Sequence, residues 1–177
     1  MTETLVWRHE VGWAEARVVE SRWRLRAEAK DRERVARHLG LQAVDSLSAD
    51  LVGAPWQDGL EITGTVWATV TRLCGVSLES FDETIDEPLR FRVVPQTSAR
   101  APRSSEREVI VDLDEEDPPD GLNGDTVDLG AYVVEALGLA LDPFPRKPGM
   151  AFEPLEEGGA VSPFAVLASL NTTLDQG

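Results

Sequence analysis

Residues 125–149 read DTVDLGAYVVEALGLALDPFPRKPG, and this stretch decides the fold of the chain. Apolar residues recur every three or four positions from Leu129 to Leu141, as they do on one face of a helix. Asp128 precedes this pattern as a candidate N-cap, because its carboxylate can accept a backbone N–H of the first turn. Pro143 ends it, since proline disfavours the helical conformation of the residue before it. The pattern therefore predicts one buried helix over that span.

The segment that follows, PFPRKPG at residues 143–149, is called the hook below. Its three prolines remove backbone donors and stiffen the chain, so it fits neither a helix nor a central strand. Phe144 offers an aromatic anchor, while Arg146 and Lys147 offer donors to a phosphate or a carboxylate. Two interpretations stay open at this point. The hook is a binding surface, or its prolines only seal the end of the helix and tuck Phe144 into the core.

The charge balance limits the classes of partner. The 177 residues hold 32 acidic and 17 basic side chains, a net charge of -15. Such a field repels nucleic acid and anionic membranes, so a basic protein is an easier direct partner than naked RNA. No apolar run reaches the ~18 residues of a membrane span, and the first residues lack the pattern of a signal peptide. We expect a soluble, cytoplasmic protein.

The first 40 residues differ from the rest, with nine basic and seven acidic side chains. Residues 22–26 alternate between arginine and apolar residues and predict a strand. A helix is expected over residues 30–39, with Gly40 in the left-handed position that ends it. This helix carries three arginines that we consider as part of a binding surface: Arg32, Arg34 and Arg37. A solvated helix face is the alternative.

The middle of the chain alternates as strands do, over residues 41–53, 60–74 and 81–94. The last two predict a long antiparallel hairpin, with a bend or bulge near Gly64. Pro88 favours an edge or bulge position for its strand. A turn is expected over Pro55-Trp-Gln-Asp-Gly59. Further weak patterns predict a short first strand over 5–11, a strand over 108–113, a terminal helix over 163–170, and flexible loops over 96–106 and 153–159.

Together these elements predict a single α+β domain over residues 1–177. We expect a mainly antiparallel sheet of about five to seven strands, with two main helices and a short third. The side chains expected in the core are Trp23, Leu25, Val66, Val70, Phe91, Val133, Leu137 and Leu141.

Motifs of catalysis or metal binding are missing from the sequence: it has no phosphate-binding glycine loop, nucleophile elbow or zinc-binding histidine pair. The single cysteine, Cys74, is interpreted as a small packing residue at a strand end. The acidic run 114–124 suggests calcium, but it lacks the alternation of an EF-hand and fits a solvated loop better. We therefore predict no enzyme, no catalytic residue, no metal and no cofactor.

Three stretches together resemble one family. They are GTVWATVTRLCGVSLESF at residues 64–81, DLGAYVVEALGLAL at 128–141 with the hook after it, and SPFAVL at 162–167. Their order and spacing are similar to those of the bacterial DUF177, or YceD, family, over roughly residues 20–170. The hook is similar to that of the alphaproteobacterial branch. Many relatives carry Cys-x-x-Cys where this chain has Cys74 and Ser77, a departure that argues against a shared metal or redox role.

The resemblance implies a non-catalytic factor of ribosome biogenesis, needed for 23S rRNA accumulation. Its partner would be a ribosomal protein or pre-23S rRNA, with indirect contact to the RNA favoured by the acidic charge. The candidate binding residues are those of the hook and of the basic helix: Phe144, Arg146, Lys147, Arg32, Arg34 and Arg37. The alternative is a small-molecule-binding protein or enzyme with a pocket under the loop at 96–106.

Overall fold

The computed structural model describes residues 6–16, 18–102 and 118–150. Their helices and strands run in the order β1 (Glu10–Gly12), α1 (Trp13–Ala16), β2 (Ser21–Arg26), α2 (Ala29–Leu39), β3 (Ala43–Trp56), β4 (Gly59–Leu73), β5 (Ser80–Pro95), β6 (Asp120–Leu122), β7 (Thr126–Asp128) and α3 (Leu129–Ala140). None of these helices is long and apolar enough to cross a membrane.

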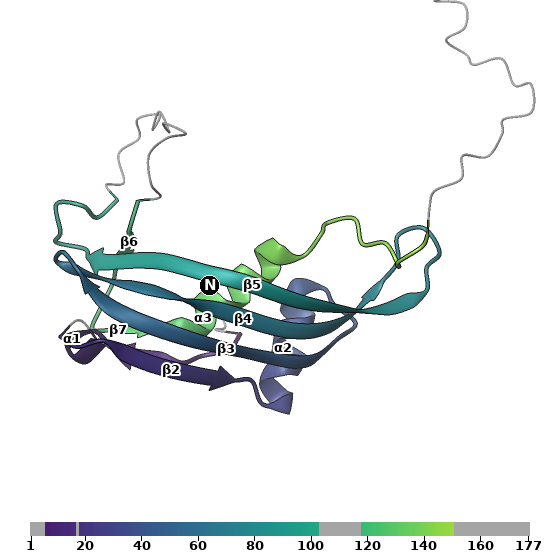
Figure 1. Ribbon diagram of the computed structural model, residues 1–177, viewed down its shortest axis with the longest axis horizontal. Coiled ribbons are helices and arrows are strands. Elements are labelled where there is room, and N and C mark those ends of the chain that lie inside the picture. The colour runs from purple at the N-terminus through teal and green to yellow at the C-terminus, as the bar shows by residue number, and fades with distance from the viewer. Residues whose placement is uncertain (1–5, 17, 103–117, 151–177) are drawn as a thin grey trace, which may run out of the picture.

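Five strands form one sheet in the order β2-β3-β4-β5-β6, and β1 pairs with β7 in a separate two-stranded sheet (Figure 1). Every pair is antiparallel except β5 with β6, which is parallel. The expected hairpin is β4–β5, paired without interruption from Leu60 opposite Val93 to Leu73 opposite Ser80. The α+β class and the mainly antiparallel sheet are therefore confirmed.

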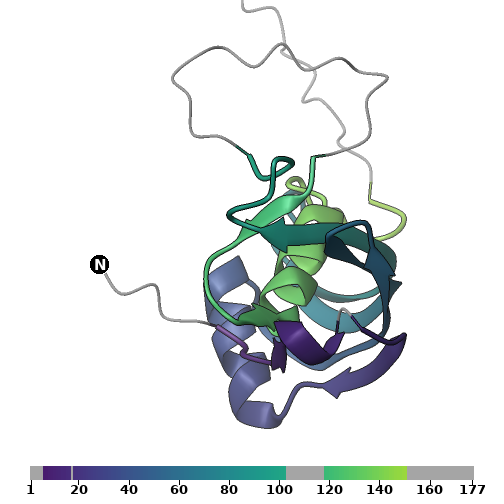
Figure 2. The same ribbon diagram turned by 90° about the vertical axis from the view of Figure 1, so that its left-hand side faces the viewer.

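Both long helices lie on the same side of the sheet (Figure 1). Figure 2 shows the sheet curving around α3, with α2 beside it. The core fills the space between them, because alternate side chains of each strand face the helices. Fully buried side chains include Leu51 on β3, Val66 on β4 and Leu137 on α3. Each contributes about 1.5–3 kcal/mol relative to an exposed position.

The predicted helix ends are close to the observed ones. Helix α3 begins after Asp128, whose Oδ1 accepts the Gly130 N–H at 3.1 Å, so the expected N-cap is confirmed. Helix α2 ends at Gly40, which has the expected left-handed conformation with φ of 66°. Five of the eight expected core residues are fully buried, whereas three are only partly buried against the core: Trp23, Phe91 and Leu141.

Two details of the long strands were predicted wrongly. Strand pairing runs through Gly64 without a register shift, and the irregularity lies between Val44 and Ser46 on β3. Gly64 is needed for another reason, since a Cβ there would lie 2.1 Å from a backbone oxygen of β3. The expected turn over 55–59 is shorter, because pairing draws Pro55 and Trp56 into β3 and leaves two residues for the turn.

At the N-terminus the strand is β1, later and shorter than the expected 5–11, because its pairing partner β7 has three residues. Strand β6 lies inside the acidic run that we interpreted as a loop. The expected strand 108–113, helix 163–170 and loop 153–159 lie outside the described residues, as does part of the loop 96–106.

Candidate functional site

The hook is tied to the connector between β4 and β5, residues 74–79, and the two segments together are called the hook end below. The N–H of Gly75 donates to the carbonyl oxygen of Pro145 at 2.9 Å. Lys147 Nζ donates to Glu79 Oε2, also at 2.9 Å. This pair raises the pKa of Lys147 and lowers the pKa of Glu79, so both groups stay charged near neutral pH. The hook is therefore held in one position on the body of the domain.

Arg72, near the end of β4, anchors the point where the hook leaves α3. It is 8% exposed and is the buried charged residue of the described chain. Its Nη1 donates to Glu83 Oε2 at 2.8 Å, and its Nη2 donates to the backbone oxygen of Asp142. A guanidinium can make both bonds because its N–H groups form a rigid fork. Arg72 shares the buried face of β4 with Val66 and Val70, and no sequence pattern predicted its role as an anchor.

Cys74 is fully buried beneath the hook. Three donors point at its sulfur: the backbone N–H of Lys147, the hydroxyl of Ser77 and the backbone N–H of Ser77. The Ser77 nitrogen is 3.4 Å from the sulfur. In that order of strength, these donors lower the pKa of the Cys74 thiol from 9.0 to about 6. Cys74 is buried at a strand end, as expected, and its sulfur faces N–H and hydroxyl donors. Ser77 supplies two of these donors.

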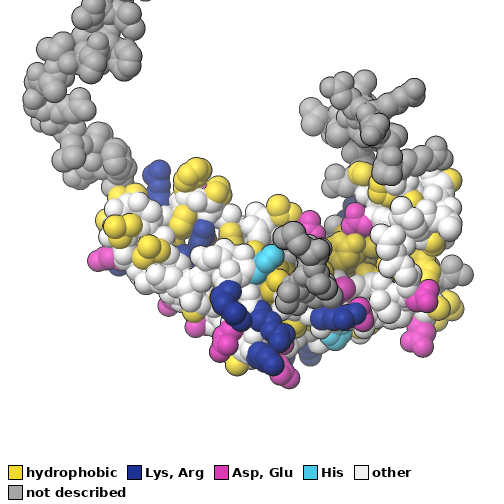
Figure 3. Space-filling model, turned by 180° about the vertical axis from the view of Figure 1, so that it is seen from behind, with side chains coloured by type: hydrophobic (Ala, Val, Ile, Leu, Met, Phe, Trp, Pro, Cys, Tyr) yellow, Lys and Arg dark blue, Asp and Glu magenta, His cyan; other side chains and the backbone are white. Residues whose placement is uncertain are grey.

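The hook end exposes apolar side chains although its backbone is fixed. Phe144 is 75% exposed, so it is not tucked into the core. Hydrophobic side chains gather at this end of the molecule in Figure 3. The large exposed ones that belong to or border the hook end are Leu73, Leu78, Phe144 and Met150. Arg146 is exposed among them. An aromatic anchor with a cation beside it is a common feature of protein interfaces.

The end of α2 borders the hook, because Leu39, Gly40 and Leu41 line one cavity together with Pro143 and Pro145. Arg32 donates to the carbonyl oxygen of Ala27 at 2.9 Å, and Arg34 pairs with Asp31 at 3.3 Å. Arg37 donates to a carbonyl oxygen of its own helix and is exposed. All three guanidinium groups remain partly accessible.

A cavity of about 630 Å³ lies between β5 and α3. Its lining does not include residues 96–102, and residues 103–106 lie outside the described part of the chain, so a pocket under that loop stays a prediction. The titratable pair beside the cavity is Tyr132 and Asp120, whose oxygens are 2.8 Å apart. Burial, and then this hydrogen bond, raise the pKa of Tyr132. The tyrosine therefore stays a protonated donor near neutral pH and does not act as a base.

Among the described residues, no group of three histidine, cysteine, aspartate or glutamate side chains is placed to hold a metal ion. The calcium hypothesis concerned residues 114–124, of which 114–117 are outside the described residues.

Comparison with known proteins gives one match. No curated protein and no solved structure matches the chain. The family model described as "Large ribosomal RNA subunit accumulation protein YceD" matches residues 62–171. This span contains β4, β5, α3 and the hook, and begins after β2, α2 and β3. Because the match covers more than half of the chain and includes the whole hook end, the chain belongs to the YceD family of large ribosomal RNA subunit accumulation proteins.

Proposed function

We propose that this chain is a non-catalytic factor of large ribosomal subunit biogenesis, which supports 23S rRNA accumulation by binding an assembly partner at the hook end. The family describes an accumulation protein rather than a reaction. One observation carries the proposed surface: Phe144 is exposed on a hook whose backbone is bonded to the domain. A surface that is already ordered loses little conformational entropy when it binds.

The direct partner is a ribosomal protein, and pre-23S rRNA is reached through it. The net charge of -15 repels RNA from the protein as a whole. At the hook end, Phe144 fills an apolar pocket of the partner while Arg146 and Lys147 meet its polar rim. The arginines of α2, whose last turn borders the hook, extend this surface. The complex forms in the cytoplasm, where the subunit assembles.

The test is a double variant, Phe144→Ala with Arg146→Ala, expressed in a strain that lacks the wild-type protein. Both side chains are exposed, so the fold is retained. We expect at least about tenfold weaker association with pre-ribosomal particles, because truncating aromatic and arginine anchors costs about 2 kcal/mol. The level of 23S rRNA, measured by quantitative hybridisation, falls with it.

The matched control is Val19→Ala with Arg22→Ala, which also removes one exposed apolar side chain and one exposed arginine. It should leave particle association and RNA level unchanged. A folded hook variant with normal 23S rRNA would contradict the hook as the contact surface.

A further inference from the structure

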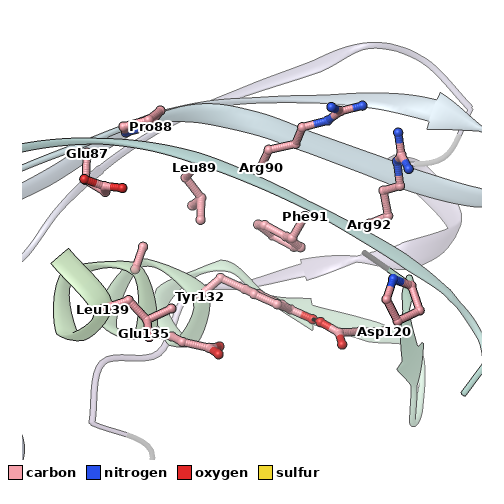
Figure 4. A pocket seen from close by; sticks show the side chains of 12 residues that line it. Glu87, Pro88, Leu89, Arg90, Phe91, Arg92, Asp120, Tyr132, Glu135 and Leu139 are labelled. Carbon is pink, nitrogen blue, oxygen red and sulfur yellow. Dashed lines mark hydrogen bonds between the residues drawn. The ribbon is translucent and has the colours of Figure 1, made fainter. Parts of the chain in front are cut away.

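A groove runs between β5 and α3, on the helix side of the sheet (Figure 4). Phe91 and Tyr132 stack across its floor, with ring centres 3.6 Å apart and planes 11° from parallel. Leu89 and Leu139 continue the apolar lining. Leu139 is 81% exposed, the most exposed of the large apolar side chains in the described residues. The groove thus presents apolar surface that the described chain leaves uncovered.

The charged residues that line this groove are three carboxylates and two arginines: Glu87, Asp120, Glu135, Arg90 and Arg92. Glu87 on β5 and Glu135 on α3 line it, and neither has an ion-pair partner among the described residues. Asp120 lines it too and accepts the Tyr132 hydroxyl. Figure 4 shows the side chains of Arg90 and Arg92 on the far side of β5 from α3. There both donate at 2.9 Å to Glu61, a carboxylate that does not line the groove.

A second cavity of about 280 Å³ extends the groove toward the start of α3. The two cavities share Asp120, Tyr132 and Glu135 in their linings. Asp128 lines the second one, and its Oδ2 is buried without a hydrogen-bond partner in the described chain, while its Oδ1 caps α3. Asp128 thus adds a carboxylate to the lining at this end of the groove.

Beside the groove, β5 forms an edge of the sheet. Strand β6 pairs with Val93–Pro95 only, and no strand of the described chain pairs with residues 80–92 on that side. An open edge can accept an added strand. Pro88 lacks an N–H and interrupts the row of donors, so an added strand gains most of its affinity from side chains in the groove.

From these four features we infer that the groove binds an extended, lysine-rich segment of another protein. Apolar side chains of the segment would cover Leu89 and Leu139, and its ammonium groups would meet Glu87 and Glu135. Its backbone would pair with β5 on either side of Pro88. The protein's net charge of -15 draws such a cationic segment in and repels an anionic one.

The probe is a synthetic nine-residue peptide with lysine and leucine in turn at every second position and threonine between them, so that both residue types face the same side of an added strand. It is titrated into the full-length protein by calorimetry. We expect saturable binding that weakens with added salt, and no binding of the same peptide with glutamate in place of lysine. Amide exchange gives a second readout: the peptide should protect backbone amides of residues 80–92.

The critical variant is Glu87→Lys with Glu135→Lys, which should weaken binding at least about tenfold. Its control, Glu15→Lys with Glu33→Lys, makes the same change in net charge on α1 and α2 and should weaken binding by less than about threefold through the long-range field alone. If both variants lose the same amount of peptide affinity, net charge explains the binding and the groove is not the binding site. The readout uses the β5 amides that do not donate to β4. A peptide that fails to protect them, or their protection already in the free protein, would overturn the groove without any variant.

Binding here is independent of the proposed function. The variant Phe144→Ala with Arg146→Ala should bind the peptide as the wild type does, because neither residue lines the groove. Loss of peptide binding in that variant would overturn the separation of the two surfaces.

Discussion

The hook end and the groove both use α3, yet their polar groups are in opposite states. At the hook end, Arg72, Cys74 and Lys147 each have hydrogen-bond partners. In the groove, Glu87 and Glu135 have no ion-pair partner in the described chain, and an oxygen of Asp128 is buried without a donor. Buried polar groups with partners make a segment rigid, whereas groups without partners favour the arrival of a ligand. This difference indicates that the hook end is a rigid surface, whereas the groove is suited to bind a ligand.

The two regions also differ in charge. The hook end combines exposed apolar side chains with Arg146 and Lys147, and the groove combines apolar side chains with carboxylates. One protein can therefore contact two surfaces of different charge without competition between them. Each prediction below removes one interaction that makes the regions differ.

The largest effect is expected from Arg72→Ala. It removes two charge-assisted bonds from a buried site, to Glu83 and to the backbone of Asp142. We expect the free energy of unfolding to fall by about 3 kcal/mol, measured by urea denaturation. The hook should also lose amide protection, because its entry point is no longer held.

The control for this change is Arg22→Ala, which breaks an ion pair whose arginine side chain is 77% exposed. It should cost no more than about 0.5 kcal/mol. If Arg72→Ala costs as little as the control, the hook is not anchored through β4, and the contrast between a fixed and an open region is lost.

The next effect concerns the pH dependence of stability and is tested with Cys74→Ser. In the folded protein the pKa of Cys74 is lowered to about 6, from an ordinary 9.0. The thiolate is thus favoured by folding, so its contribution to stability is complete above about pH 9 and is lost as the pH falls to 6. The wild type should gain stability relative to Cys74→Ser between these values.

Two readouts check this: urea denaturation at several pH values, and thiolate absorbance at 240 nm with the serine variant as baseline. The neighbouring charges do not interfere, since the pKa of Glu79 is lowered and that of Lys147 is raised, which moves both away from this window. A thiol that titrates near pH 9 in the folded protein would show that the hook does not stabilise the Cys74 thiolate.

Local patterns predicted much of the fold. Helix α3 was placed within a residue of its end because its apolar period, its Asp128 cap and Pro143 all lie within one short stretch. The faces of β4 followed from alternation for the same reason. Strand β6 was missed because three residues of mixed character become a strand only through pairing with distant Val93–Pro95.

The site was less predictable than the fold. Sequence indicated the hook, but not whether Phe144 is buried, because that depends on how the hook meets the connector. Arg72 could have been found from an arginine that continues an otherwise apolar inner face. The groove had no local signal, because Glu87 and Glu135 come from separate elements and acquire a shared role only in the packed domain.

The smallest effect is expected from Tyr132→Phe, in the groove. It keeps the ring stacked on Phe91 and removes only the bond to Asp120, whose carboxylate is exposed to water. The cost should be about 1 kcal/mol, below that of Arg72→Ala, because water can replace the lost donor.

The pKa of Tyr132 is raised from 10.0, so the wild type should also lose stability above pH 10, where the unfolded tyrosine ionises and the folded one does not. The variant should lack this decline. Freed from the hydroxyl, Asp120 should attract the lysine peptide at least as strongly as before, measured by the same calorimetric titration. A variant that is about 3 kcal/mol less stable would show that this bond holds the groove as firmly as Arg72 holds the hook, and the contrast between the two regions would fail.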